Sequence, residues 1–336
     1  MRGVNRYIII VVAIVIIVTA STLAATLPQH GSATRDDRVR IGFFANVTHA
    51  PALIAKANGI FEDELRGYKV EYKVFNAGPD AILALLTGNI DFAYVGPVPA
   101  LNSYIASNGS TKIIAGVTAN GAMLVVRDDI NSIYDMNGRV IGSPQYANTQ
   151  DVALKSYLAD NGIDAKVINA KNRELLLLLA NGYIDGAWVP EPWATRMLVY
   201  GKVLVDERSI WSDGIFATTV LITTDDVIDG KREVVDGLLR AHIRSIEFIE
   251  SNDKYATTLI EEIAELTGQR LDRDMVSSSL KNVRFTYEPM QESIQGYYEK
   301  GRRLGLITSD IKIHDVFYTE PLENLKGIRN NENIKQ

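Results

Sequence analysis

Apolar and polar positions along the chain alternate between strand-like and helix-like patterns. At 68–75, Val70, Tyr72 and Val74 alternate with charged residues, as in a half-exposed strand. Apolar positions spaced three and four residues apart predict helices between such segments, and an almost purely leucine run at 174–180 predicts a buried helix. Further strands are predicted at 39–44, 112–126 with a break at 118–121, 139–142 and 215–223. This alternation of strands and helices predicts an α/β fold.

One segment of the chain occurs twice. GNIDFAYVGPVPA at Gly88–Ala100 reappears as GYIDGAWVPEPWA at Gly182–Ala194, and each copy follows an upstream Ile-Gly pair, at 41–42 and 141–142. In both copies a helix ends at a glycine, a short apolar strand follows, and a proline-bearing turn begins the next helix. The repeat therefore predicts two similar lobes with a ligand cleft between them.

The remaining pattern sets the expected domain boundaries. From Asp225 onward it is helical, with helices predicted at 234–249, 254–267, 273–280 and 290–304, which we expect to complete the first lobe. Lobe 1 then comprises 39–118 plus 220–318, and lobe 2 comprises 119–219. The lobes would be joined by crossings near 118–121 and 217–220. A polar tail covers 319–336, and its part after Gly327 is expected to be loose.

The N-terminus has the pattern of an export segment. Arg2 and Arg6 precede an apolar run at 7–18, and small residues follow up to Ala25. Segment 1–27 is thus predicted to be a signal peptide or a membrane anchor helix, followed by a linker at 28–38. Cleavage near Ala24 and retention both remain open, with retention favoured because the chain has no cysteine to carry a lipid. A buried N-terminal helix is the third alternative. Either export interpretation predicts an extracytoplasmic protein.

Composition excludes several classes of function. The apolar content of 46% and charged content of 23% are those of a globular protein, and the net charge of −6 gives no support to nucleic-acid binding. The absence of cysteine excludes disulfides, thiol nucleophiles and cysteine-ligated metals. No catalytic, P-loop or dinucleotide-binding motif is present. The four histidines are widely separated: His30, His49, His242 and His314. We therefore predict no enzymatic activity, no cofactor and no metal site.

Four loops are expected to line the cleft, each running from a strand end into a helix start: 44–49, 96–99, 143–150 and 188–193. Ligands of α/β sheets bind at this place, where helix N-termini point toward them. None of the four loops contains Lys or Arg. An anion would then be bound by backbone N–H groups, helix dipoles, and the hydroxyls or amides of Asn46, Thr48, Asn148 and Thr149. Interleaved aromatic residues suit a small ligand with a polar head and an apolar body.

The predicted substrate-binding residues are Asn46, Thr48, His49, Tyr94, Gly96, Pro97, Val98, Gly121, Tyr146, Asn148, Thr149, Trp188, Glu191, Trp193 and Thr218. Several have a structural alternative. Asn148 equally suits a helix cap, in a capping box with Asp151. Tyr94 and Trp188 equally suit the core, and Glu191 equally suits a first-turn carboxylate.

Several segments together carry a family resemblance: IGFFANVTHAPA at 41–52, YVGPVPA at 94–100, NTQDVAL at 148–154, WVPEPW at 188–193, VLVDE at 203–207 and TTVL at 218–221. In these the chain resembles the substrate-binding proteins of ABC importers for sulfonates, taurine and nitrate, over roughly 39–304. The resemblance implies a two-lobed periplasmic-binding-protein-like fold of type II, whose lobes close over a ligand and dock on a membrane permease. By position it assigns ligand contacts to Asn46, Thr48, Asn148, Thr149 and Glu191.

The expected function is accordingly that of an extracytoplasmic, monomeric solute receptor. It would deliver a small sulfonate-like organic anion to an ABC permease with its ATPase subunits. The alternatives are a nitrate- or bicarbonate-binding protein, and a binding protein or enzyme for a thiamine-precursor pyrimidine. That enzyme branch of the wider group uses a cysteine cluster, so the absence of cysteine counts against it. A membrane-anchored sensory ectodomain is a further alternative.

Overall fold

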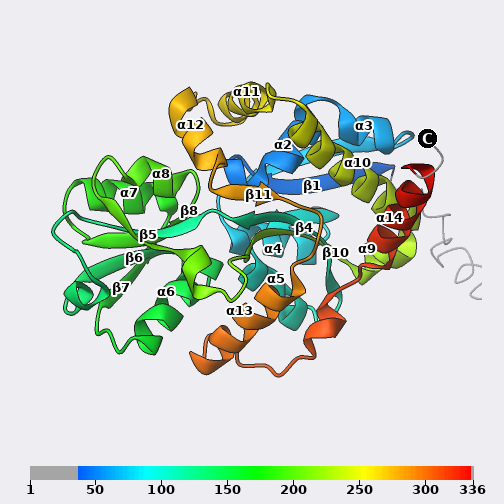
Figure 1. Ribbon diagram of the computed structural model, residues 1–336. Coiled ribbons are helices and arrows are strands. Elements are labelled where there is room, and N and C mark those ends of the chain that lie inside the picture. Colours follow the sequence, from blue (N-terminus) through cyan, green and yellow to red (C-terminus); the bar gives the residue numbers. More distant parts are fainter. Residues whose placement is uncertain (1–36, 334–336) are drawn as a thin grey trace, which may run out of the picture. The chain divides into compact units, whose positions relative to one another are not determined.

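The computed structural model describes residues 37–333, which form two β-sheets surrounded by helices (Figure 1). The six-stranded sheet has the order β11-β4-β10-β3-β1-β2 and the five-stranded sheet the order β7-β6-β8-β5-β9. Their strands are β1 (Arg38–Phe44), β2 (Lys69–Phe75), β3 (Phe92–Val95), β4 (Thr111–Asn120), β5 (Ala122–Val126), β6 (Val140–Pro144), β7 (Lys166–Ala170), β8 (Gly186–Pro190), β9 (Lys202–Asp206), β10 (Ala217–Thr224) and β11 (Val283–Phe285).

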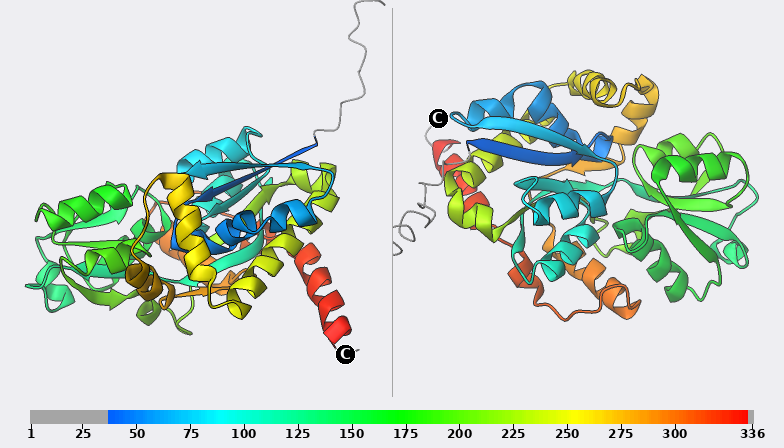
Figure 2. Two further views of the ribbon diagram at one scale, coloured as in Figure 1. Left: turned by 90° about the horizontal axis from the view of Figure 1, so that it is seen from above. Right: turned by 180° about the vertical axis from the view of Figure 1, so that it is seen from behind.

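The helices of the first two thirds of the chain mostly connect these strands. They are η1 (Val47–His49), α2 (Ala50–Ala57), α3 (Ile60–Glu64), α4 (Gly78–Leu86), α5 (Pro97–Ala106), η2 (Ile133–Met136), α6 (Thr149–Asp160), α7 (Asn172–Ala180), α8 (Trp193–Met197) and η3 (Glu207–Ile210). The later helices are α9 (Asp225–Gly230), α10 (Arg232–Ser251), α11 (Tyr255–Thr267), α12 (Arg273–Leu280), α13 (Gln291–Arg303), η4 (Ile313–Val316) and α14 (Glu320–Asn333). Figure 2 shows α10 and α11 beside the six-stranded sheet, where both pack on α2.

The two sheets repeat one topology, as the sequence repeat predicts. β1 is parallel to β2 and β3, and β6 is parallel to β7 and β8. The next strand in each sheet, β10 or β5, is antiparallel to both of its neighbours. The chain passes from the first sheet to the second between β4 and β5, and returns between β9 and β10. These passages lie near the predicted crossings, while the lobe boundaries themselves stay a prediction.

The aspartate of each repeat, Asp91 or Asp185, makes the same pair of hydrogen bonds at the start of its parallel strand pair. The Asp91 carboxylate accepts a hydrogen bond from the Arg40 N–H at 2.8 Å, and the Asp91 N–H donates to the Arg40 carbonyl at 2.8 Å. Asp185 makes the same two bonds with Val140, at 2.9 and 2.7 Å. Each aspartate thus stands at the end of a parallel ladder. Without it, the N–H and carbonyl of Arg40 or Val140 would lack partners there. We call this pair of bonds the aspartate clip.

The glycine of each Ile-Gly pair leaves room for the isoleucine that precedes the clip. A Cβ on Gly42 would lie 2.6 Å from Cδ1 of Ile90. A Cβ on Gly142 would lie 3.2 Å from Cδ1 of Ile184 and 2.5 Å from Leu175. Both distances to isoleucine are shorter than ordinary van der Waals contact. The two separated parts of the repeat, Ile-Gly and Gly-x-Ile-Asp, are therefore one packing unit in space.

Several sequence expectations were wrong or lie outside the described residues. The helix at 174–180 is not buried throughout: in α7 only Leu175 and Leu179 are buried, and Leu177 is 54% exposed, because one face of the helix is free. After Gly327, where a loose tail was expected, α14 continues to Asn333. The later helices do not serve only the first lobe, because Tyr297 of α13 joins the hydrophobic cluster of the second sheet.

The predicted signal or anchor segment at 1–27 lies outside the described residues, as does most of the linker at 28–38. Within residues 37–333, no helix has both the length and the apolar content needed to cross a bilayer.

Replacing Asp91 by Ala is expected to lower the free energy of unfolding by about 3 kcal/mol, because the Arg40 N–H loses a buried acceptor and Lys231 loses its carboxylate partner. Asp185→Ala should cost less, about 1–2 kcal/mol, since the Asp185 side chain is 21% exposed against 9% for Asp91. Urea unfolding measures both. Asp253→Ala, at an exposed position, is the control. Equal, small changes at all three positions would contradict the aspartate clip.

Candidate functional site

The first predicted loop forms the short 3-10 helix η1 after β1. The Asn46 side-chain oxygen caps it, accepting from the Thr48 N–H at 3.0 Å and from Thr48 Oγ1 at 2.8 Å. His49 is buried against the Phe44 ring, and its Nδ1 accepts from the Phe44 N–H at 3.3 Å. Burial lowers the pKa of His49 to about 3, so the imidazole is neutral near pH 7. These side chains shape the turn at the end of β1.

The second and third loops meet at the start of two helices that belong to different sheets. The Val98 N–H, in the first turn of α5, donates to Thr149 Oγ1 at the start of α6 at 3.3 Å. A Cβ on Gly96 would lie only 2.6 Å from that same oxygen. Gly96, Pro97, Val98 and Thr149 are therefore brought together, as the sequence predicts for a shared cleft.

The loop that leads into α6 is organised by a buried carboxylate, Asp151. Asp151 has no exposed surface and accepts from the Ala147 N–H at 2.9 Å, Ser143 Oγ at 2.6 Å, Asn169 Nδ2 at 2.8 Å and Lys155 Nζ at 2.7 Å. The expected capping box is wrong: the Asn148 side chain makes no cap hydrogen bond, and Asp151 reaches Ala147 instead.

Two residues of this loop deviate from ordinary backbone geometry. Gln145 and Ala147 have φ values of +37° and +55°. Such left-handed conformations are costly outside glycine and persist where the surroundings hold them. The bond from the Ala147 N–H to Asp151 supplies part of that constraint. Tyr146 between them is 67% exposed, and its ring centroid lies 4.6 Å from Lys155 Nζ.

In the fourth loop, Glu191 is completely buried and links two distant parts of the chain. Its carboxylate accepts from the Thr195 N–H at 3.0 Å and Thr195 Oγ1 at 2.8 Å, which is the first-turn role considered as an alternative. It also accepts from Asn282 Nδ2 at 2.6 Å, and its N–H donates to the Gly121 carbonyl at 2.8 Å. Burial raises the pKa of Glu191.

Gly121 stands at the crossing between the sheets, beside this carboxylate. Its φ of +76° suits glycine, and a Cβ there would lie 2.4 Å from Val283 Cγ1. Trp193, at the start of α8, is half-buried, with the Arg196 guanidinium 4.6 Å from its ring. Helix α12 packs on both η1 and α8, and so lies beside the first and fourth loops.

Two predicted aromatic contacts belong to the hydrophobic cores, which is the alternative interpretation given to them. Tyr94 and Trp188 have no exposed surface. The Tyr94 hydroxyl lies 3.3 Å from His242 Nδ1, and Trp188 Nε1 donates to Glu207 at 2.7 Å. Glu207 is fully buried, which raises its pKa to about 7. The polar atoms of both aromatic residues are thus already bonded.

At the return crossing, Thr218 Oγ1 donates to the Asn120 carbonyl at 2.6 Å. The next residue, Thr219, was not predicted as a site residue, and its buried Oγ1 has no hydrogen-bond partner. Asp151 and Asn282 were also missed. For Asp151, the spacing in the NTQD segment was the one local signal. Asn282 had no local signal, because its partner Glu191 lies 91 residues away in the sequence.

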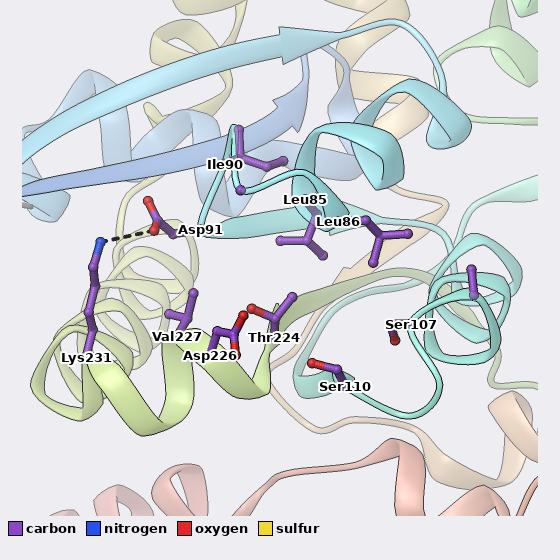
Figure 3. Close-up of a pocket in the computed structure, with 12 residues that line it drawn as sticks. Leu85, Leu86, Ile90, Asp91, Ser107, Ser110, Thr224, Asp226, Val227 and Lys231 are labelled. Atoms are coloured by element: carbon purple, nitrogen blue, oxygen red, sulfur yellow. Dashed lines mark hydrogen bonds and ion pairs between the residues drawn. The ribbon is translucent and has the colours of Figure 1, made fainter. Parts of the chain in front are cut away.

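Two cavities of the described region lie away from these loops. One, of about 490 Å³, lies at the start of β3 and the end of β10, near the ion pair between Asp91 and Lys231 (Figure 3). Another, of about 410 Å³, is lined by Thr257, Ile260 and residues 270–273. Neither is lined by a predicted site residue. No group of three or more metal-binding side chains occurs within 37–333.

Comparison with known proteins places the chain in a family. The model of the NMT1-like family matches residues 32–266, which is more than half of the sequence. A protein of Brucella abortus (strain 2308), named as a binding protein, is 25% identical over 273 residues, which is 78% of this chain and 81% of the relative. The taurine-binding periplasmic protein of Escherichia coli (strain K12) is 26% identical over 200 residues, or 57% of this chain and 61% of that protein.

A solved structure shares the fold. The alkanesulfonate-binding protein of Xanthomonas axonopodis pv. citri, bound to MOPS, has a TM-score of 0.72 with 15% identity, covering 85% of this chain and 100% of that one. These relatives are named as binding proteins, in agreement with the expectation that the chain is not an enzyme. The chain belongs to the NMT1-like family and has the α/β fold of the periplasmic binding proteins.

Proposed function

We propose that this chain, a solute-binding protein of the ABC import type, delivers a small organic anion to its permease from outside the cytoplasm, and that the anion is an aliphatic sulfonate. The observation that carries the proposal is the meeting of α5 and α6 at Val98 and Thr149. Helix N-termini carry partial positive charge, so two of them at one point favour an anion between or beside them. The taurine- and alkanesulfonate-binding proteins among the similar proteins support the sulfonate class.

The solute would be held without a counter-cation from the loops. The four loops contain no Lys or Arg, so backbone N–H groups and neutral hydroxyls would bind the head group. The half-buried Trp193 and the exposed Tyr146 would border the apolar part of the solute. The export segment at 1–27 places the protein outside the cytoplasm in this proposal, and its retention as an anchor stays a prediction.

The mechanism follows from the contact between the two sheets. A solute that touches both the α5 side and the α6 side would stabilise the state in which Gly96 and Thr149 are in contact. A solute that touched only one side would leave the balance between open and closed states unchanged. The closed state would then be the form presented to the permease.

The solute class is tested by thermal unfolding of the purified chain with taurine, longer alkanesulfonates, nitrate, bicarbonate and aminopyrimidines. A sulfonate that binds, present at a free concentration of 100 times its Kd, should stabilise the folded protein by about 2.7 kcal/mol. It should raise Tm by roughly 5–10 °C. A shift with nitrate or an aminopyrimidine, and none with any sulfonate, would overturn the sulfonate assignment. Unchanged solute after incubation is the expected result for a receptor.

Lobe closure is tested at Gly96. Gly96→Ala should weaken binding of the solute about 10-fold, because the new methyl group would lie 2.6 Å from Thr149 Oγ1 and keep the helix ends apart. The backbone there is extended, which alanine adopts freely, so Tm without solute should change little. Calorimetric titration measures the affinity.

Two variants act as controls for this experiment. Gly230→Ala adds a methyl group where nothing lies within 4 Å, and should bind as the unmodified chain does. Adding Thr149→Ala to Gly96→Ala removes the clashing oxygen together with one proposed ligand contact, so the loss of affinity should be smaller than the sum of the losses for the two single changes. Equal affinity of Gly96→Ala and the unmodified chain would show that this contact is not part of the ligand-bound state.

A further inference from the structure

The side chain of Thr219 has an unusual environment. The residue is 1% exposed, and its Oγ1 is buried without a hydrogen-bond partner. Buried side-chain hydroxyls in folded proteins almost always have a partner, so such an exception calls for an explanation. Its neighbour in sequence differs, because Thr218 Oγ1 already donates to the Asn120 carbonyl at 2.6 Å.

The sheet register places this hydroxyl at the end of the first sheet where the predicted loops begin. Thr219 of β10 pairs with Thr118 of β4, and directly opposed residues on neighbouring strands point to the same face. Thr118 Oγ1 donates to the Thr48 carbonyl of η1 at 2.7 Å, so that face lies against η1. Both β4 and β10 pack on η1. The hydroxyl therefore belongs to the face that η1 covers.

The same register brings Thr219 close to the helix junction. Val220, the next residue, pairs with Val95, which is followed by Gly96 at the start of α5. The ladder between β10 and β4 is irregular on both sides of Thr219, with register shifts between Ala217 and Thr219 and between Thr219 and Val220. Bulges of this kind occur next to functional sites, where they redirect a side chain.

We propose that Thr219 binds the head group of the solute, its Oγ1–H donating a hydrogen bond to an oxygen of the anion. This inference rests on the proposed function and assigns a specific donor to it. The adjoining loops carry no Lys or Arg that could pair with an anion. The Thr219 hydroxyl would therefore serve as a neutral hydrogen-bond donor to an anionic oxygen. In this proposal the contact from β10 is made by Thr219, one residue after Thr218, which the sequence analysis predicts.

The burial of Thr219 is consistent with a solute that is enclosed. Thr219 is shut off from solvent on the face that η1 covers, in a structure in which Thr149 also contacts α5. A solute could reach its hydroxyl only while the two sheets are apart, and the bond would form as they close. The contact would then be made in the closed state and contribute to its stability.

The test compares Thr219→Val with Thr218→Val in the full chain, with taurine as the sulfonate probe and nitrate as the second anion. Thr219→Val should bind the probe 10- to 100-fold more weakly, because a hydrogen bond to a charged group is lost. Its Tm without probe should stay the same or rise, since an unpartnered buried hydroxyl is removed. Thr218→Val should lower Tm by about 2–4 °C through loss of the bond to Asn120.

Thr219→Ser keeps the hydroxyl and should retain most of the affinity, which separates hydrogen bonding from shape. The inference is overturned if Thr219→Val binds the probe as tightly as the unmodified chain. It is equally overturned if Thr219→Val lowers Tm as much as Thr218→Val, because the hydroxyl would then have a structural partner. If the unmodified chain binds neither taurine, nor a longer alkanesulfonate, nor nitrate, the proposed anion-binding function fails together with this inference.

Discussion

The candidate site depends on the close approach of two helix beginnings at a residue without a side chain. Gly96 allows Thr149 Oγ1 to reach the first turn of α5 and accept from the Val98 N–H. Two helix N-termini repel each other electrostatically, because both carry partial positive charge. Asp151 supplies a carboxylate to the first turn of α6, whereas the first turn of α5 contains no acidic residue. The beginning of α5 therefore lacks a negative partner of its own, and in the proposed function the anionic solute would lie against it.

The repeated framework leaves these helix beginnings free for binding. Asp91 and Asp185 bond to the residues that begin the parallel ladders, so each aspartate clip secures its sheet at the end opposite to the loops. Gly42 and Gly142 pack against Ile90 and Ile184 in the same part of each lobe. The aspartate clips and the predicted binding loops thus lie at opposite ends of the same strands.

Much of the fold was predictable because local patterns determine it, whereas the site depends on register and on distant contacts. Most strands, most helices and the repeat of the two sheets were predicted correctly from periodicity, glycines and prolines, whereas β9 and β11 were not predicted. The direction of Tyr94 and Trp188 was not, because both faces of a central strand are apolar and alternation carries no signal there. Thr218 was predicted as a ligand contact, and neither its bond to the Asn120 carbonyl nor the register shifts in β10 can be seen in sequence. Asp151 was read as a cap, although it organises the preceding loop.

The later part of the chain constrains how the two lobes can move. Asn282, next to β11, donates to Glu191, and the Tyr297 hydroxyl of α13 donates to Glu207 at 2.6 Å. Both carboxylates are buried in the second lobe, and both lie near the crossings, since Glu191 bonds to Gly121 and Glu207 follows β9. Breaking either bond would leave a buried carboxylate short of a donor, which costs more than separating Val98 from the Thr149 hydroxyl. In the proposed opening and closing, the motion of least cost would therefore keep the contacts of Glu191 and Glu207 and separate Gly96 from Thr149.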